Sequence, residues 1–184
     1  MPKPLYQGQL DGLCSIYAIL NASHSVAPRH FDEVKKDELF IKLINELFAL
    51  HKKGETPGDI LTEGVGFERL KKLIDVVKAD FAEWGYGGKM IVFERAFAKN
   101  SVCEERVWES FDEHLKNGGK RAILIKLEGH WSVVSKMTEN QMTLKDSDGS
   151  KIINWQNYYV KANNSKEGQI ISPTKSFLVS LQDK

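Results

Sequence analysis

The residue best suited to nucleophilic chemistry is Cys14, which lies about one turn into a buried helix predicted by the apolar run over residues 13–22. A cysteine attacks as its thiolate, and a helix N-terminus stabilises that anion through its unpaired N–H groups and its dipole. The preceding Asp11-Gly12 step adds a plausible helix cap and a glycine that lets a substrate backbone approach closely. Cys14 is therefore a candidate nucleophile. The alternative is a small buried hydrophobe, the usual state of a free cysteine.

The only other cysteine, Cys103, is a weaker candidate. It lies in Ser101-Val102-Cys103-Glu104, a pattern typical of a capping box that opens a helix. Glu104 and Glu105 follow it directly and oppose a thiolate. We expect Cys103 to be structural and not bonded to Cys14, because a nucleophilic thiol cannot also form a bridge. Two cysteines exclude a disulfide scaffold and a four-cysteine zinc site, and we expect no metal and no other cofactor.

A candidate base lies in the second half of the chain, in Leu127-Glu128-Gly129-His130-Trp131-Ser132-Val133-Val134. Here a histidine opens an apolar strand. A cysteine protease has its nucleophile on a helix and its base on a facing sheet. The imidazole takes the thiol proton, and the imidazolium then holds the thiolate as an ion pair. A lone histidine is usually structural, so the role of His130 depends on its pairing with Cys14.

An acid that could orient His130 follows after one hairpin, in Met142-Thr143-Leu144-Lys145-Asp146-Ser147-Asp148-Gly149. A carboxylate at the end of the neighbouring strand could accept the imidazole N–H and fix its tautomer. Asp146 is favoured over Asp148, because Asp148-Gly149 is a tight-turn dipeptide. The alternative is that both acids only build the turn.

The pair of His130 and Asp146 also predicts the hairpin between their strands. Both side chains must project from one face of the sheet, and side chains alternate along a strand. A regular two-residue loop at Glu139-Asn140 would place Asp146 opposite Val133, on the face away from His130. We therefore predict an odd-numbered loop, or an even-numbered loop corrected by a β-bulge.

Acyl transfer also needs hydrogen-bond donors aimed at the developing oxyanion. The backbone N–H of Cys14 is one candidate. The side-chain amide of Gln9, five residues earlier, is the second, and Gln7 remains a rival. Either glutamine could instead be an exposed loop residue, which is the commoner fate of glutamine.

In chain order, Gln9, Cys14, His130 and Asp146 resemble the site of the papain-like cysteine peptidases. Within that superfamily, the segments at residues 129–134 and 144–146 are most similar to the double-glycine leader peptidases. These are the N-terminal protease domains of bacteriocin exporters.

This sequence departs from the family pattern at three points. The spacing from Gln9 to Cys14 is one residue shorter than in papain-like enzymes. Ser15 replaces a glycine, and Ser147 replaces a proline.

The resemblance implies a hydrolase of the thiol protease type that cleaves proteins or peptides through a thioester, with a Gly-Gly pair before the cleaved bond. It further implies a free-standing relative that acts in the cytoplasm. Such relatives include bacterial toxin or effector domains delivered into a target cell within a larger secreted protein. A toxin of this kind implies a cognate immunity protein as a partner.

Two other functions remain open. The same three residues perform deamidation or transamidation of glutamine, because acylation of the thiol is common to these reactions. A binding module could also keep the fold without turnover. Finally, Asp11-Gly12-Leu13-Cys14 resembles the Asp-Gly-x-Cys start of ovarian-tumour-type deubiquitinases, a peptidase variant with a different substrate.

The elements that must position these residues fall into two groups. Apolar side chains at three- and four-residue spacing predict further helices at residues 37–52, 66–84 and 101–116. Strands are predicted at 90–93, 121–127, 131–136, 142–145, 151–155 and 177–181. Helices before strands predict an α+β fold with an antiparallel sheet. We expect one papain-like domain over residues 1–184, with a helical part at about 11–84 and a sheet part at about 89–182.

The composition sets outer limits on function. Hydrophobic residues are 41% and charged residues 28% of the 184, a globular balance that excludes a disordered chain. The net charge of +1 argues against nucleic acid as a partner. The apolar run at 13–22 is too short to span a membrane, and no basic segment precedes a cleavage site, so we expect neither a membrane partner nor a secretory signal.

Overall fold

The computed structural model describes residues 13–52, 54–63, 65–98, 102–127, 130–146, 149–160 and 169–184. Within these ranges, helices lead and an antiparallel sheet follows, which confirms the predicted α+β class. The elements are α1 (Cys14–Val26), α2 (Glu33–Ala49), α3 (Pro57–Glu63), α4 (Phe67–Glu83), β1 (Lys89–Arg95), α5 (Glu104–Lys116), β2 (Arg121–Lys126), β3 (Trp131–Met137), β4 (Gln141–Asp146), β5 (Gly149–Asn154), η2 (Trp155–Asn157), β6 (Tyr158–Val160), β7 (Gln169–Ile171), η4 (Pro173–Lys175) and β8 (Phe177–Asp183).

The main sheet has six antiparallel strands in the order β1-β8-β2-β3-β4-β5. The last strand of the chain, β8, lies between β1 and β2, where Val179 is paired with Phe93 on one side and Ala122 on the other. Through β8, the sheet joins β1, which follows the first helices, to β3 and β4, whose ends position His130 and Asp146. The parallel pair of β6 and β7 was not predicted, because strands of three residues are too short to show a period.

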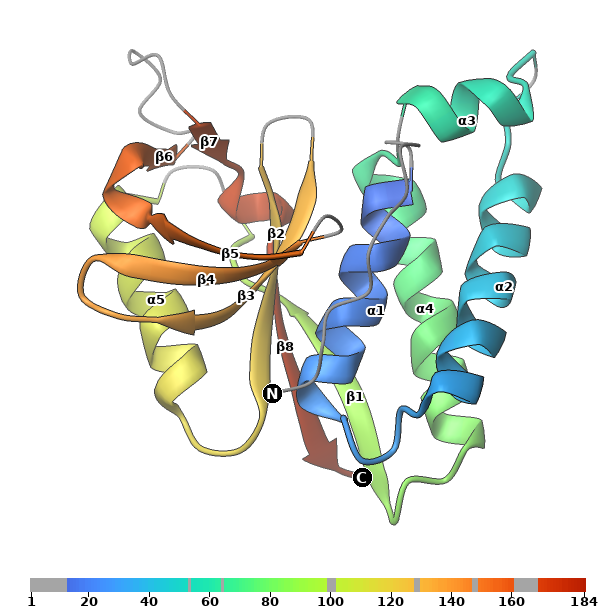
Figure 1. Cartoon of the computed structure of the whole chain (residues 1–184), viewed down its shortest axis with the longest axis horizontal. Helices are drawn as coiled ribbons and strands as arrows, with labels where there is room; N and C mark the ends of the chain where they lie inside the picture. Colours follow the sequence, from blue (N-terminus) through green and yellow to red (C-terminus); the bar gives the residue numbers. More distant parts are fainter. Residues whose placement is uncertain are drawn as a thin grey trace.

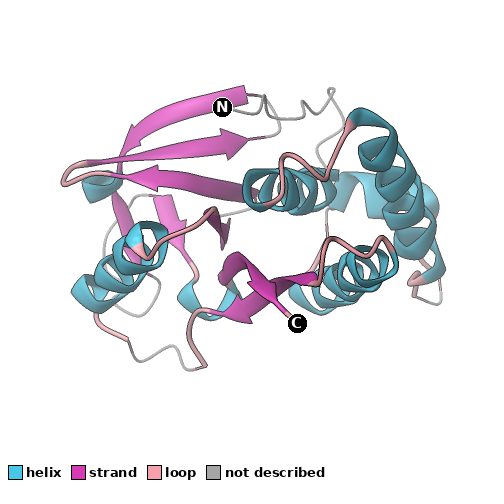
Figure 2. Cartoon of the chain, turned by 90° about the horizontal axis from the view of Figure 1, so that it is seen from below, coloured by secondary structure: helices cyan, strands magenta, loops and turns pink. Residues whose placement is uncertain are grey.

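Helix α1 lies between the sheet and the pair of α2 and α4 (Figures 1 and 2). It is buried on nearly every face, and Ile16, Ile19 and Leu20 have no exposed surface. These side chains join one core with residues of α2, α4 and the facing strands. The helix runs to Val26, beyond the predicted end at residue 22. Its last turn is polar in sequence, yet the Ser23 hydroxyl donates to the Ile19 carbonyl within the helix.

Helix α5 covers the opposite side of the sheet, where Val107, Trp108 and Phe111 form a second core with residues of β2, β3 and β4. The predicted capping box is wrong: the helix begins at Glu104, and its N-cap is Cys103, which makes no side-chain cap bond. Ser101, the expected cap, lies outside the described residues. Glu104 instead accepts a hydrogen bond from the Trp108 indole at 3.3 Å.

The connection between α2 and α4 contains a short helix, α3, that was not predicted from the sequence. Pro57 is the first residue of α3, a position that suits proline because the N–H there needs no helical partner. Thr56 caps the helix: its hydroxyl accepts from the Asp59 N–H at 3.2 Å, and Asp59 accepts from the Thr56 N–H at 2.7 Å. In the described part of the chain, none of the helices combines the length and apolarity needed to cross a bilayer.

Candidate functional site

Cys14 is the first residue of α1, and its side chain is almost fully enclosed, with 3% of the residue exposed. The N-cap, Leu13, offers no capping side chain, so the first N–H groups of α1 have no partner within the helix. Such N–H groups and the helix dipole favour an anion at this position. The expected cap Asp11 and its neighbour Gly12 lie outside the described residues.

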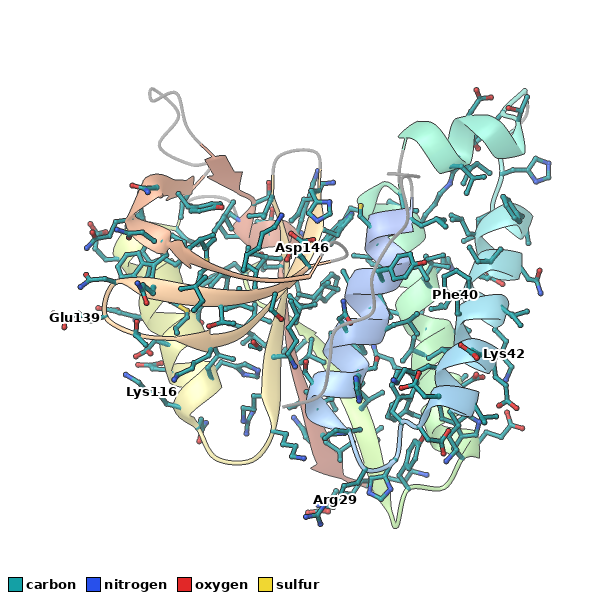
Figure 3. The ribbon with its side chains drawn as sticks, in the orientation of Figure 1. Arg29, Phe40, Lys42, Lys116, Glu139 and Asp146 are labelled. Atoms are coloured by element: carbon teal, nitrogen blue, oxygen red, sulfur yellow. The ribbon has the colours of Figure 1, made fainter. Side chains whose placement is uncertain are left out.

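His130 directly precedes β3, and Asp146 is the last residue of β4. Figure 3 shows Asp146 at the end of β4 that lies beside the start of α1. The His130 Nε2 atom bonds Asp146 Oδ1, and the ring also shares a hydrogen bond with the Cys14 thiol. Because Asp146 occupies Nε2, the nitrogen left for the thiol is Nδ1. The structure thus brings together the three residues that the sequence singled out.

The predicted hairpin geometry is confirmed. The Thr138 N–H donates to the Gln141 carbonyl at 2.8 Å, which closes a two-residue loop at Glu139 and Asn140. The register then shifts between Val134 and Lys136, and this bulge restores the required alternation. Pairing of Val133 with Lys145 leaves Ser132 opposite Asp146, which puts the carboxylate on the same face as His130.

The charged surroundings of His130 favour its protonated form. The hydrogen bond that His130 donates to Asp146, followed by the one that it donates to Cys14, raises the pKa of His130 to about 9 despite burial, which acts in the opposite direction. The Asp146 side chain is only 7% exposed, so water weakens this attraction little. Imidazolium is therefore the main form of His130 at neutral pH.

The thiol of Cys14 is subject to opposing effects. Burial raises its pKa, but hydrogen bonds from His130 and from the Trp131 backbone N–H, with the positive charges of His130 and Lys126, bring the pKa below its ordinary value. A lowered pKa of Cys14 beside a raised pKa of His130 favours a thiolate and an imidazolium held as a pair. This is the ground state that a cysteine nucleophile requires.

Two parts of this environment were missed by sequence analysis. Lys126 ends β2 and pairs with Trp131 across the sheet, with its ammonium 5.1 Å from the indole centre. The Trp131 N–H donates to the thiol, and its indole N–H donates to the Val65 carbonyl at 3.1 Å. The one available signal for Lys126 was a basic residue that ends the apolar run Ala122-Ile123-Leu124-Ile125 just before His130.

The remaining predicted residues are separate from this group or outside the described chain. Cys103 is exposed and Cys14 buried, and both are free, which confirms the expectation that they form no disulfide. Gln9 and its rival Gln7 lie outside the described residues, as does Asp148, the alternative to Asp146. Of the proposed oxyanion donors, the structure places only the Cys14 backbone.

Comparisons with known proteins add no second line of evidence: no family model, no curated protein and no solved structure matches the chain. Across the part of the chain that the structure describes, no three or more histidine, cysteine, aspartate or glutamate side chains form a group that could hold a metal ion. What the arrangement can do chemically therefore follows from its own geometry. A thiolate, an imidazolium and an orienting carboxylate that contact one another in this order suit acyl transfer through the cysteine.

Proposed function

We propose that this protein is a papain-like cysteine peptidase in which Cys14 is the nucleophile, His130 the general base and acid, and Asp146 the residue that orients His130. The observation that carries the proposal is one continuous chain of hydrogen bonds. It runs from a thiol at a helix N-terminus to an imidazole, and from that imidazole to a buried carboxylate. A structural cysteine does not need either partner.

The reaction follows from these roles. The thiolate of Cys14 attacks the carbonyl carbon of the substrate amide, and the oxyanion is stabilised by the Cys14 backbone N–H and a second donor, for which Gln9 is the candidate. His130 gives its proton to the leaving amine as the C–N bond breaks, which leaves a thioester on Cys14. His130 then takes a proton from water, and the hydroxide releases the acid and restores the thiolate.

The first test is the reactivity of the two thiols toward iodoacetamide at pH 6–7. We expect rapid alkylation in the wild type and in Cys103→Ala, and loss of the rapid phase in Cys14→Ala, because among the described residues an imidazolium partner is found for Cys14 and not for Cys103. Alkylation of Cys14 no faster than that of an ordinary exposed thiol would contradict the proposal and favour a binding module.

The second test identifies the reaction. Cells expressing the wild type or Cys14→Ala are compared for new protein N-termini and for mass changes in intact proteins. A peptidase produces N-termini that are absent with Cys14→Ala, and we expect that variant to lose activity on the order of thousands-fold. A gain of about one mass unit without cleavage would identify glutamine deamidation, which uses the same acylation step.

The likeness to double-glycine leader peptidases extends the proposal to the substrate. We propose cleavage after a Gly-Gly pair and a role as a bacterial toxin or effector domain with a cognate immunity protein. The new N-termini test the first point, because mapped sites should follow two glycines. Co-expression with candidate immunity proteins tests the second, since a true partner should restore the growth of intoxicated cells.

A further inference from the structure

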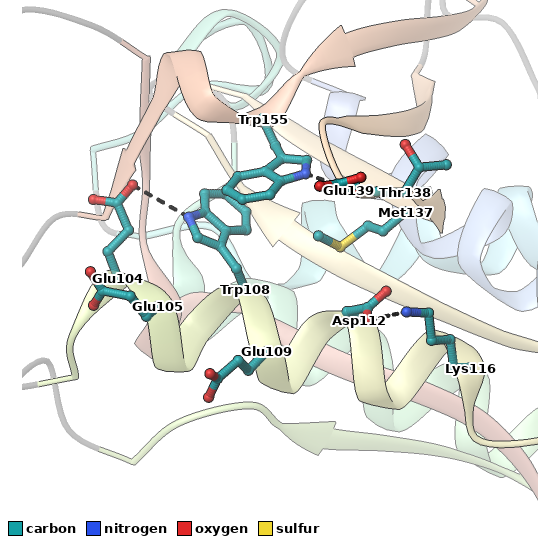
Figure 4. A pocket seen from close by; sticks show the side chains of 10 residues that line it. All are labelled: Glu104, Glu105, Trp108, Glu109, Asp112, Lys116, Met137, Thr138, Glu139 and Trp155. Carbon is teal, nitrogen blue, oxygen red and sulfur yellow. Dashed lines mark hydrogen bonds and ion pairs between the residues drawn. The ribbon is translucent and has the colours of Figure 1, made fainter.

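A hollow of about 560 Å³ lies on the α5 side of the sheet, between that helix, the end of β3 and η2 (Figure 4). Two indoles form its apolar floor. Trp108 of α5 and Trp155 of η2 have ring centres 5.0 Å apart, and Met137 of β3 lies beside them. Both indole N–H groups are already used, by Glu104 and by the Thr138 carbonyl. The indoles can therefore contact a ligand through their carbon surfaces and π-electrons, and not as hydrogen-bond donors.

Carboxylates surround this floor. Five acids line the hollow, namely Glu104, Glu105, Glu109, Asp112 and Glu139, against one base, Lys116. That base is already paired with Asp112 at 2.6 Å. Within the described part of the chain, no ion pair involves Glu105, Glu109 or Glu139, and all three are exposed. The hollow thus has an excess of negative charge beside an apolar floor.

The spacing of the acids on α5 adds to this argument. Glu105, Glu109 and Asp112 are separated by four and three residues, so they share one face of the helix and extend over about 10 Å. Like charges at these spacings repel one another, which weakens a helix. A cation lying along the row would remove the repulsion.

We propose that this hollow binds a basic, arginine-containing segment of a partner protein. A guanidinium stacks on an indole through its planar face and also pairs bidentately with carboxylates, so it matches both the floor and the rim. Alternate side chains of an extended segment lie about 7 Å apart, so two basic side chains fit along the row of acids while an apolar side chain between them faces Met137 or the indoles.

The hollow is remote from the proposed catalytic group. Met137 ends β3 and His130 precedes its start, so the seven-residue strand, about 23 Å long, separates them. Binding at the hollow therefore does not require Cys14. The proposal is independent of the proposed function and can be tested on a chain that cannot turn over.

The test uses the full chain carrying Cys14→Ala and measures fluorescence anisotropy of a short labelled peptide of alternating arginine and leucine. A matched peptide with glutamate in place of arginine is the ligand control. We expect saturable binding of the arginine peptide only, weakened at least about tenfold by Glu109→Lys with Glu139→Lys, since each change replaces an attraction by a repulsion. Trp155→Leu, which keeps an apolar floor without the π-surface, should weaken binding severalfold.

The protein control is Asp37→Lys with Asp75→Lys, two exposed acids on α2 and α4 that change the net charge by the same amount. This pair should bind the arginine peptide as the parent does. Equal weakening by both pairs of substitutions would show attraction to net charge alone and would overturn the proposal. Binding of the glutamate peptide with similar affinity, or no binding of the arginine peptide, would overturn it as well.

Discussion

The Cys14 thiol is enclosed to a degree that would, by itself, keep it protonated. Three positive influences reverse that tendency: the imidazolium of His130, the Trp131 N–H and the ammonium of Lys126. Cys103, by contrast, is exposed at the N-cap of α5. The reactivity expected of the Cys14 thiol therefore depends on its neighbours and not on the residue type.

Substitution of Asp146 by Asn should reveal how much of the thiolate depends on the carboxylate. Without that charge, the pKa of His130 falls from about 9, the imidazolium becomes less stable, and the pKa of Cys14 rises. We expect slower alkylation of Asp146→Asn at pH 6, and an activity profile whose alkaline limb moves to lower pH. The rate of iodoacetamide alkylation between pH 4 and 10 measures the first effect, and the rate of substrate cleavage over the same pH range measures the second.

The same variant has a signature in stability. His130 has a higher pKa in the folded chain than its ordinary value of 6.5, so its contribution is complete below pH 6.5 and is lost as the pH rises through about 9. The difference in unfolding free energy between the wild type and Asp146→Asn should therefore shrink between these pH values, as measured by urea denaturation. A constant difference, together with an unshifted alkylation profile, would show that Asp146 does not act through the charge of His130.

Lys126 should tune the thiol through charge alone, because it lies beside the site without occupying a position in the hydrogen-bonded chain. Lys126→Met keeps the packing of the long side chain over Trp131 and removes the charge. We expect severalfold slower alkylation of Cys14 at pH 6 and little change well above the thiol pKa. Lys126→Arg is the matched control and should behave like the wild type. An equal loss in both variants would indicate packing rather than charge.

At the scale of secondary structure, local patterns predicted most of what positions the site. The apolar periodicity of residues 66–84 matched α4 closely, because a half-buried helix displays its period in sequence. His130 and Asp146 were found because each stands at the end of a strand beside a turn. Contacts between paired strands have no such pattern in the amino-acid sequence. Lys126 lies beside the thiol only because β2 pairs with β3, and no spacing in the sequence shows that pairing.

The first turns of α1 offer a test of an unsatisfied group. The Ser15 hydroxyl is buried and has no hydrogen-bond partner among the described residues. We expect Ser15→Ala to stabilise the protein by about 0.5–1 kcal/mol, because the hydroxyl lost its water without gaining a bond and alanine favours a helix. Urea denaturation followed by circular dichroism measures this change.

Ser23→Ala is the control within the same helix, since the Ser23 hydroxyl donates to the Ile19 carbonyl at 2.9 Å. It should give no gain in stability, because the lost hydrogen bond offsets the better helix propensity. If Ser15→Ala destabilised the protein more than Ser23→Ala, the Ser15 hydroxyl would have a partner in solution that the described residues do not provide.

On the scale of the whole molecule, the candidate site lies where the helices meet the sheet. α1 contacts α2 and α4 on one side and β2, β3, β4 and β8 on the other, so the helix that carries Cys14 is common to both halves (Figure 1). β8 returns to the centre of the sheet and pairs with β1 as well as β2. A chain divided near residue 85 would leave the apolar surface of α1 without one of its two partners.

This arrangement predicts that the helical part and the sheet part unfold as a unit. In the Cys103→Ser variant, Cys14 is the sole thiol, and its rapid alkylation depends on His130 and Lys126 of the sheet part, so the disappearance of that rapid phase in increasing urea reports separation of α1 from the sheet. We expect its midpoint to coincide with the loss of helix measured by circular dichroism, because α1 cannot separate from the sheet without exposing the core it shares with α2 and α4. A site built on a peripheral helix would open first, at lower urea. Disappearance of the rapid phase well before the loss of helix would therefore show that the helical part and the sheet part unfold separately.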